Sequence, residues 1–291
     1  PGDTVQDSPI PGEWNPQNYD RSFHGTVSYR TALTYSYNVP AIKVAMKYGT
    51  EKTIKLAKRL GITTLVEDDD NPAMAVGGLT HGVTPLEMAG AYAGIANMGK
   101  FNKPTPIIKI LDRNGKVLYE HKTNPTQAVK PESAYMMISM MEDVMTRGTG
   151  RGAAISRPCA GKSGTTDNYH DAWFVGFTPN LACAVWIGDD NNESLGGMTG
   201  GGQPATLWRA FMSGALDGIP AEDFEKPDGF KMPAPKYEAP KPQPKKQTTK
   251  KQDTKKQDSK KEDALPGGGN VPQPPRSGKS STPPPVRPPK Q

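Results

Sequence analysis

Two short groups of polar residues in this chain carry side chains suited to acyl transfer. Lys162-Ser163-Gly164-Thr165-Thr166 combines a cation, three hydroxyl groups and a glycine, and Ser36 and Asn38 stand two residues apart. Acyl transfer through a serine needs a nucleophile, a base, donors to the oxyanion and groups that hold the substrate. A cation beside hydroxyl groups suits a substrate that ends in a carboxylate. Either group alone is a weak signal, because the first occurs in many surface turns and the second is typical of helix caps.

The first group is expected to lie on a β-strand. Side chains alternate along a strand, so Lys162 and Gly164 would face one way and Ser163 and Thr165 the other. The missing side chain of Gly164 would let a substrate backbone approach closely. Ser36 and Asn38 are expected in a turn between two helices, with both side chains directed into one cleft.

The elements around these groups predict an α+β fold, with helices first and an antiparallel sheet late in the chain. Residues 1 to about 24 are predicted to be an extended surface segment, followed by a helix from Thr26. Pro40 suits the first turn of the next helix, and Thr84-Pro85-Leu86-Glu87 is a capped helix start. The other expected elements are helices separated by Gly49 and ended by Gly61, a hairpin at 104–120, a helix at 131–145, strands at 159–165, 172–177 and 181–187, a glycine-rich loop at 196–202 and a helix at about 204–216.

The basic character of the chain is confined to its C-terminal end. Residues 231–291 contain 15 Lys or Arg and 5 Asp or Glu, net +10, whereas the remaining 230 residues have net charge −4. A nucleic-acid partner is therefore not expected, because that needs basic groups on a folded face. A repeat beginning Lys-Lys-Gln offers no apolar side chain to bury, so we predict that residues 226–291 are a disordered Lys/Pro-rich tail beside a folded region at 1–225.

No metal, nucleotide or other cofactor is expected. Cys159 and Cys183 lack metal-ligand spacing, and two small apolar residues in strands are favoured over a disulfide. Gly200-Gly201-Gly202 is not followed by the Lys-Ser/Thr of a phosphate loop. The acidic run at 67–70 is expected to be a solvated loop. Residues 172–188 are apolar but interrupted by Thr178-Pro179-Asn180, which predicts a hairpin and not a membrane span.

In their order along the chain, the two polar groups match a known signature. Ser-x-x-Lys, then Ser-Asp-Asn, then Lys-Thr-Gly is typical of penicillin-binding proteins and related β-lactamases. The chain resembles the transpeptidase domain of class A (bifunctional) penicillin-binding proteins over about residues 7–215, so residues 1–225 would be a partial transpeptidase domain. The stretches that carry the resemblance are Ser36–Ala41, Gly77–Leu79, Gly82–Ala89, Arg147–Gly150, Asp171–Phe177 and Val185–Asp189.

The resemblance implies a serine-type D-Ala-D-Ala transpeptidase or carboxypeptidase that cross-links peptidoglycan stem peptides and is acylated by β-lactam antibiotics. Ser36 and Lys162 would be the catalytic residues, with Ser36 relaying a proton and Lys162 supporting that transfer near the substrate carboxylate. Thr165 would bind the carboxylate and give a backbone N–H to the oxyanion. The substrate-binding residues would be Asn38, Ser163, Gly164, Thr165 and Thr166.

One part of the signature is missing. The family's Ser-x-x-Lys lies upstream of Ser-x-Asn, but Ser8, Ser22 and Ser28 are not followed by lysine three residues later. We therefore expect a nucleophile outside this chain, an inactive chain on its own, and a fragment or processed product. The resemblance also implies an upstream glycosyltransferase domain and membrane anchor, a place on the extracytoplasmic face of the membrane and, from the tail's composition, a Gram-positive bacterium.

Two other functions fit parts of the sequence. The chain could be a non-catalytic wall- or membrane-associated module whose basic tail binds anionic polymers or lipid headgroups. It could also be a β-lactamase-like hydrolase, which the long tail and the stretch from Asp171 to Asp189 fit poorly.

Overall fold

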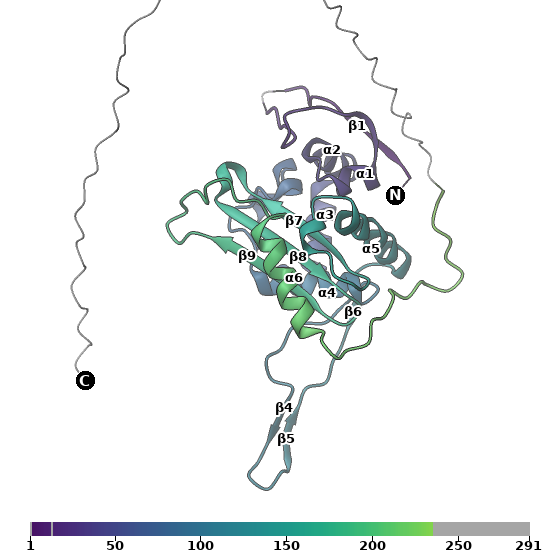
Figure 1. Cartoon of the computed structure of the whole chain (residues 1–291), viewed down its shortest axis with the longest axis vertical. Helices are drawn as coiled ribbons and strands as arrows, with labels where there is room; N and C mark the ends of the chain where they lie inside the picture. Colours follow the sequence, from purple (N-terminus) through teal and green to yellow (C-terminus); the bar gives the residue numbers. More distant parts are fainter. Residues whose placement is uncertain (1, 13, 235–291) are drawn as a thin grey trace, which may run out of the picture. The chain divides into compact units, whose positions relative to one another are not determined.

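The structure is a computed structural model that describes residues 2–12 and 14–234. Three antiparallel strands form the centre of its fold (Figure 1). The strands are β7 (Ala160–Thr165), β8 (Asp171–Phe177) and β9 (Ala182–Gly188), in the order β7-β8-β9. The predicted strands are confirmed to within one residue. In the register of β7 and β8, Lys162 lies opposite Val175 and Gly164 opposite Trp173.

Helices pack on both faces of this sheet. On one face, Trp208 of α6 (Gln203–Ala215) meets Phe174, with ring centroids 5.5 Å apart. On the other, Tyr92 of α4 (Pro85–Ala96) meets Phe177 at 6.1 Å. Phe174 and Phe177 are an odd number of residues apart on one strand, so they point to opposite faces. The α+β class predicted from the sequence is confirmed.

The other elements surround this core. Thr84 accepts a hydrogen bond from the backbone N–H of Glu87 and so caps α4 as predicted. Gly49 and Gly61 have positive φ and follow the ends of α2 (Asn38–Tyr48) and α3 (Thr50–Arg59), also as predicted. The remaining helices are α1 (Tyr29–Thr34), α2 (Asn38–Tyr48), α3 (Thr50–Arg59), α5 (Pro131–Thr146) and the short η1 (Glu67–Asp69), η2 (Pro72–Val76), η3 (Arg151–Ala153) and η4 (Asp167–Tyr169). The remaining strands pair as β1 (Thr4–Asp7) with β2 (Gly25–Ser28), β3 (Lys100–Phe101) with β6 (Thr126–Gln127), and β4 (Lys109–Leu111) with β5 (Val117–Glu120).

The N-terminal segment is more ordered than the sequence predicts. β1 and β2 pair within it, and the side chains of Asp7 and Asn18 are buried. Asn18 Nδ2 donates to the two carboxylate oxygens of Asp7 at 2.9 and 2.8 Å, and the backbone N–H of His24 donates to the same carboxylate at 2.9 Å. The prediction of an extended surface segment holds for most of residues 2–12 and 14–24, which are exposed, but not for Asp7 and Asn18, whose polar groups satisfy one another away from water. The helix predicted from Thr26 begins only at Tyr29, since Thr26 belongs to β2.

A partly buried cluster of two arginines and an aspartate joins α1 to α5. Arg30 Nη1 donates to Asp143 at 2.8 Å and to the backbone oxygen of Ser139 at 2.7 Å, and Arg147 Nη2 donates to Asp143 at 2.7 Å. Partial burial alone would raise the pKa of Asp143, but the hydrogen bonds and charges of the two arginines lower it below its ordinary value. This cluster fixes the helix that leads into the turn carrying Ser36.

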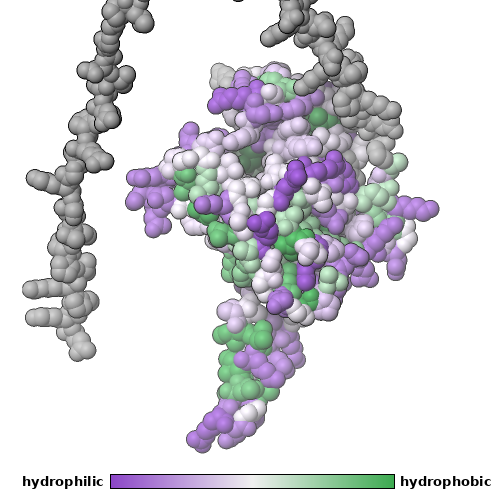
Figure 2. All heavy atoms as spheres, viewed as in Figure 1, coloured by the Kyte–Doolittle hydropathy of each residue, from purple (hydrophilic) through white to green (hydrophobic). Residues whose placement is uncertain are grey.

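The predicted hairpin of β4 and β5 projects from the fold, and apolar surface runs along it (Figures 1 and 2). Cys159 and Cys183 are free thiols packed in the apolar core beside α6, as the sequence favoured. The acidic run at 67–70 departs from expectation at Asp69, which is buried and accepts hydrogen bonds from the backbone N–H groups of Val66 and Thr80.

Two predictions concern the ends of the chain. Residues 226–234 contain no helix or strand, and the rest of the predicted tail, from 235 on, lies outside the described residues; the boundary at 225 stays a prediction. In the part of the chain that the structure describes, no helix has both the length and the apolar character needed to cross a bilayer.

Candidate active site

Ser36 lies in the tight connection between α1 and α2. Its backbone has φ of 59°, a left-handed conformation that costs a non-glycine residue roughly 1–2 kcal/mol. The connection is fixed by hydrogen bonds from the backbone N–H of Ser36 to Leu33 O at 3.2 Å and of Tyr37 to Ala32 O at 2.9 Å. The sequence predicted a turn between two helices here, and this is confirmed.

The structure brings Ser36 and Lys162 together. Lys162 Nζ donates to Ser36 Oγ at 2.7 Å and to the backbone oxygen of Ser163 at 2.9 Å. Burial disfavours the ammonium form and lowers the pKa of Lys162 to about 8 from its ordinary value of 10.5. A lysine with this pKa exchanges its proton readily near neutral pH, and its nearest hydroxyl is that of Ser36.

The hydroxyl groups that follow Lys162 have different neighbours. Ser163 Oγ lies 2.7 Å from Thr149 Oγ1, on the opposite side of the strand from Lys162 as the alternation predicts. Thr165 Oγ1 accepts the backbone N–H of Gly200 at 3.1 Å, which leaves its own proton to donate. Thr166 Oγ1 accepts the backbone N–H of Asp171 at 2.7 Å and so closes the turn between β7 and β8.

Gly164 has a close backbone neighbour within the chain itself. A Cβ placed on Gly200 would collide with the backbone oxygens of Gly164 and Trp173, so the glycine-rich loop lies directly on the end of β7. Only glycine permits this approach at position 200. The loop thereby fixes Thr165, whose hydroxyl it contacts.

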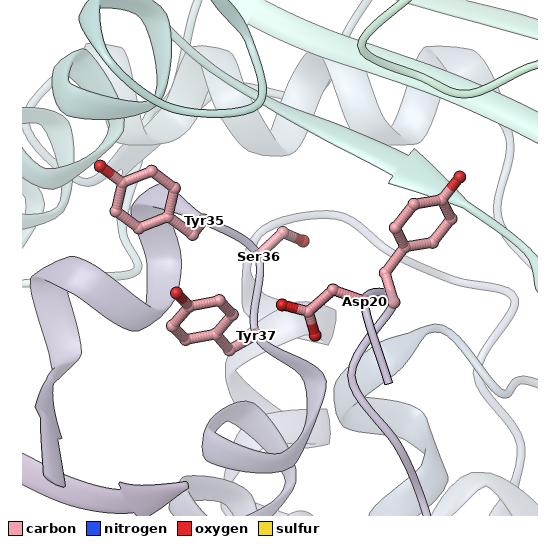
Figure 3. Close-up of a pocket in the computed structure, with 5 residues that line it drawn as sticks. Asp20, Tyr35, Ser36 and Tyr37 are labelled. Atoms are coloured by element: carbon pink, nitrogen blue, oxygen red, sulfur yellow. The ribbon is translucent and has the colours of Figure 1, made fainter. Parts of the chain in front are cut away.

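A cavity of about 220 Å³ opens beside Ser36, lined by Tyr19, Asp20, Tyr35, Ser36 and Tyr37. Figure 3 shows the carboxylate of Asp20 and the hydroxyl of Ser36 turned toward the same space, with the rings of Tyr35 and Tyr37 on one side. Asn38 begins α2 next to the cavity, and its Nδ2 donates to Gln17 O at 3.0 Å.

Sequence reasoning did not single out the other residues of this cavity. Two tyrosines flank Ser36 directly, and that adjacency was the one available signal. Nothing in the pattern connected Asp20 with Ser36, because their proximity depends on how the N-terminal segment folds over α2. In residues 2–12 and 14–234, no group of three or more His, Cys, Asp and Glu side chains is arranged to hold a metal ion.

Comparison with known proteins identifies the family of this chain. Penicillin-binding protein 1A of Aquifex aeolicus is 37% identical over 222 residues, which are 75% of this chain and 30% of that protein. Penicillin-binding protein 2D of Bacillus subtilis is 37% identical over 226 residues, 74% of this chain and 32% of that protein. The chain thus spans less than a third of the length of either relative.

Solved structures give the same answer for the fold. PonA1 from Mycobacterium tuberculosis in complex with penicillin V superposes with a TM-score of 0.71 at 28% identity, covering 83% of this chain and 69% of that one. Penicillin-binding protein 1A from Haemophilus influenzae gives a TM-score of 0.69 at 28% identity, over 77% of this chain and 40% of that one. The family model for the penicillin-binding protein transpeptidase domain matches residues 1–213, a range that includes Ser36, Lys162 and the sheet of β7, β8 and β9. The chain belongs to the penicillin-binding protein transpeptidase family.

Proposed function

We propose that this chain forms the Ser36 and Lys162 wall of a peptidoglycan D,D-transpeptidase site in a class A, bifunctional penicillin-binding protein. The observation that carries the proposal is the 2.7 Å hydrogen bond from Lys162 Nζ to Ser36 Oγ, made by a lysine whose pKa is lowered to about 8. Two groups in this arrangement can pass a proton along a hydrogen bond near neutral pH.

The nucleophile would come from sequence other than these 291 residues. No serine of the chain is followed by lysine three residues later, so none matches the nucleophile of the family signature. In the assembled site, the nucleophilic serine would attack the penultimate D-alanine carbonyl of a stem peptide and release D-alanine. The acyl group would then pass to an amine of a neighbouring strand, and a β-lactam would acylate the same serine.

Each residue of this chain would have a separate task. Ser36 would relay a proton among the nucleophile's lysine, Lys162 and the leaving group. Thr165, whose hydroxyl proton is not used by Gly200, would donate to the substrate carboxylate, and its backbone N–H would face the oxyanion. Asn38 has a second amide hydrogen and a carbonyl oxygen for the substrate's amide. Gly164, Ser163 and Thr166 would complete the substrate-binding edge.

Labelling with a fluorescent penicillin tests this proposal. The full-length protein that contains the chain should be labelled covalently, and Lys162→Ala should reduce the labelling rate sharply. Lys52→Ala, at an exposed position of α3, is the matched control and should label like the wild type. A full-length protein that is not labelled would remove the proposal. Labelling of the 291-residue chain alone would show that the nucleophile lies within it.

Further parts of the proposal concern location and the tail. An upstream anchor and glycosyltransferase domain would place the protein on the extracytoplasmic face of the membrane. Residues 231–291, with net charge +10, would bind anionic wall polymers or the membrane surface. Salt-sensitive binding to anionic vesicles should disappear when residues 231–291 are deleted. A Gram-positive origin has no support from the relatives, which include proteins of Aquifex, Bacillus and Neisseria.

A further inference from the structure

The cavity beside Ser36 has an electrostatic character that the proposed roles do not use. Asp20 contributes a carboxylate to its lining, and the buried carboxylate of Asp7 lies behind it. Burial first, and then the negative charges of Asp20 and Asp7, raise the pKa of Tyr37 above its ordinary value. The tyrosine therefore senses a negative potential on this side of Ser36.

The Asp20 carboxylate is held in place from behind. His24 Nε2 lies 3.0 Å from Asp20 Oδ2, and His24 Nδ1 lies 2.7 Å from Asp7 Oδ2. The His24 ring stacks on Tyr37 with centroids 3.9 Å apart and an interplanar angle of 8°. The backbone N–H of Ser22 also donates to Asp20 Oδ1 at 3.1 Å. Each carboxylate oxygen accepts more than one hydrogen bond, so Asp20 can still bind a donor from the cavity.

The five residues that line the cavity include no lysine or arginine. Lys162 reaches Ser36 Oγ from the β7 side at 2.7 Å, and Arg147 is paired with Asp143 at 2.7 Å. The Asp20 side thus presents a carboxylate, phenol groups and the Ser36 hydroxyl. These are the acceptors that an ammonium group needs, since it offers three N–H donors and accepts none.

We propose that this cavity is the subsite for the acceptor amine, which it binds as a primary ammonium between the Asp20 carboxylate and the Ser36 hydroxyl. The inference rests on the proposed function and adds to it the residues that receive the second substrate. A volume of about 220 Å³ has room for the ammonium and several methylene groups of a lysine-like side chain. His24 is a positioning residue, because it acts through Asp20 and Tyr37.

The position of the ammonium beside Ser36 would allow it to lose a proton and become a nucleophilic amine. Its nitrogen would lie next to Ser36 Oγ, which is hydrogen-bonded to Lys162 Nζ. Ser36 would take one proton from the ammonium while passing its own proton to a neutral Lys162. The amine is left with a free electron pair for attack on the acyl carbon, Lys162 becomes an ammonium and Ser36 is unchanged.

Amine binding can be measured on the 291-residue chain itself, by NMR on ¹⁵N-labelled protein. The probe is Nα-acetyl-lysine N-methylamide, and its Nε-acetylated form is the uncharged control. The charged probe should shift the amide resonances of Ser36 and Tyr37 with a Kd on the order of 1 mM, and the uncharged probe should not. Asp20→Asn should weaken binding by about tenfold, as expected for the loss of a charged hydrogen-bond partner. Asp112→Asn, in the exposed hairpin, should bind like the wild type.

Equal shifts with both probes, or unchanged binding by Asp20→Asn, would overturn the subsite. The comparison of the two probes on the wild type keeps the test valid even if Asp20→Asn folds poorly. Penicillin labelling of the full-length protein separates this inference from the proposed function. A labelled protein without charge-dependent amine binding overturns the subsite alone, whereas amine binding in an unlabelled protein overturns the transpeptidase reading and leaves a plain ammonium site.

Discussion

The partly buried Lys162 should make the stability of this domain depend on pH in a specific way. Its pKa is about 8 in the folded chain, against 10.5 for an ordinary lysine. Between these two values the unfolded chain binds more protons than the folded chain, so the free energy of unfolding rises with pH. The full difference corresponds to about 3 kcal/mol, which the folded protein loses at neutral pH when Lys162 is charged.

Replacing Lys162 with methionine removes this dependence. Because methionine does not titrate, the stability of Lys162→Met relative to the wild type should be greatest below about pH 8 and decline as pH rises. From the two pKa values, the difference should shrink by about 2 kcal/mol between pH 7.5 and pH 9.5. The loss of the hydrogen bonds to Ser36 and Ser163 O lowers the stability of the variant by a constant amount at all pH values and does not affect this slope.

Urea denaturation of the wild type and the variant at a series of pH values measures the effect. Lys52→Met, at an exposed position of α3, controls for the removal of a positive charge in itself. A difference between Lys162→Met and the wild type that stays constant from pH 7.5 to 9.5 would refute the reasoning, because it would mean that the Lys162 ammonium is as well solvated as in the unfolded chain.

Three further predictions about the scaffold can be tested by urea denaturation. Thr84→Ala removes the cap of α4 and should lower stability by about 1 kcal/mol, and Thr84→Ser should retain most of it. Gly200→Ala should lower stability by about 2 kcal/mol or more because its Cβ meets backbone, whereas Gly214→Ala, open to solvent in α6, should raise it by about 0.5–1 kcal/mol. Asp143→Asn should be less stable than the wild type above about pH 4, and the difference should shrink on acidification, since the lowered pKa of Asp143 contributes stability only while the carboxylate is charged. Equal stability of the two glycine variants, or a difference for Asp143→Asn that grows in acid, would contradict the contacts described.

Strands β8 and β9 of the central sheet could be predicted from the sequence because they are short, largely apolar runs bounded by turn residues, as at Thr178-Pro179-Asn180. The N-cap of α4 at Thr84 could be predicted equally well, since it depends on two residues that are three positions apart in the sequence. The contact between Ser36 and Lys162 could not be predicted from local sequence patterns, because the two residues are 126 positions apart. Only the family resemblance connected them. Local patterns carry no information about such a pair.

The N-terminal segment shows the same limit more sharply. Asp7, Asn18 and His24 have no periodic spacing, and a stretch rich in proline and polar residues is normally solvated. Here the polar side chains bury one another, and the folded segment places Asp20 against Ser36. The Tyr19 and Asp20 side of the cavity therefore depends on hydrogen bonds among polar residues, which hydrophobic patterns do not reveal.

The left-handed backbone at Ser36 has a consequence for engineering and evolution. Glycine adopts that conformation without strain, and methionine at position 162 would remove a desolvated charge, so both substitutions are expected to favour folding. A screen that rewards thermal stability alone would accumulate changes at the two positions that the proposed chemistry requires. Screens for stabilised versions of this domain should therefore keep Ser36 and Lys162 unchanged. A variant of raised thermal stability that is substituted at either position is expected to have lost activity.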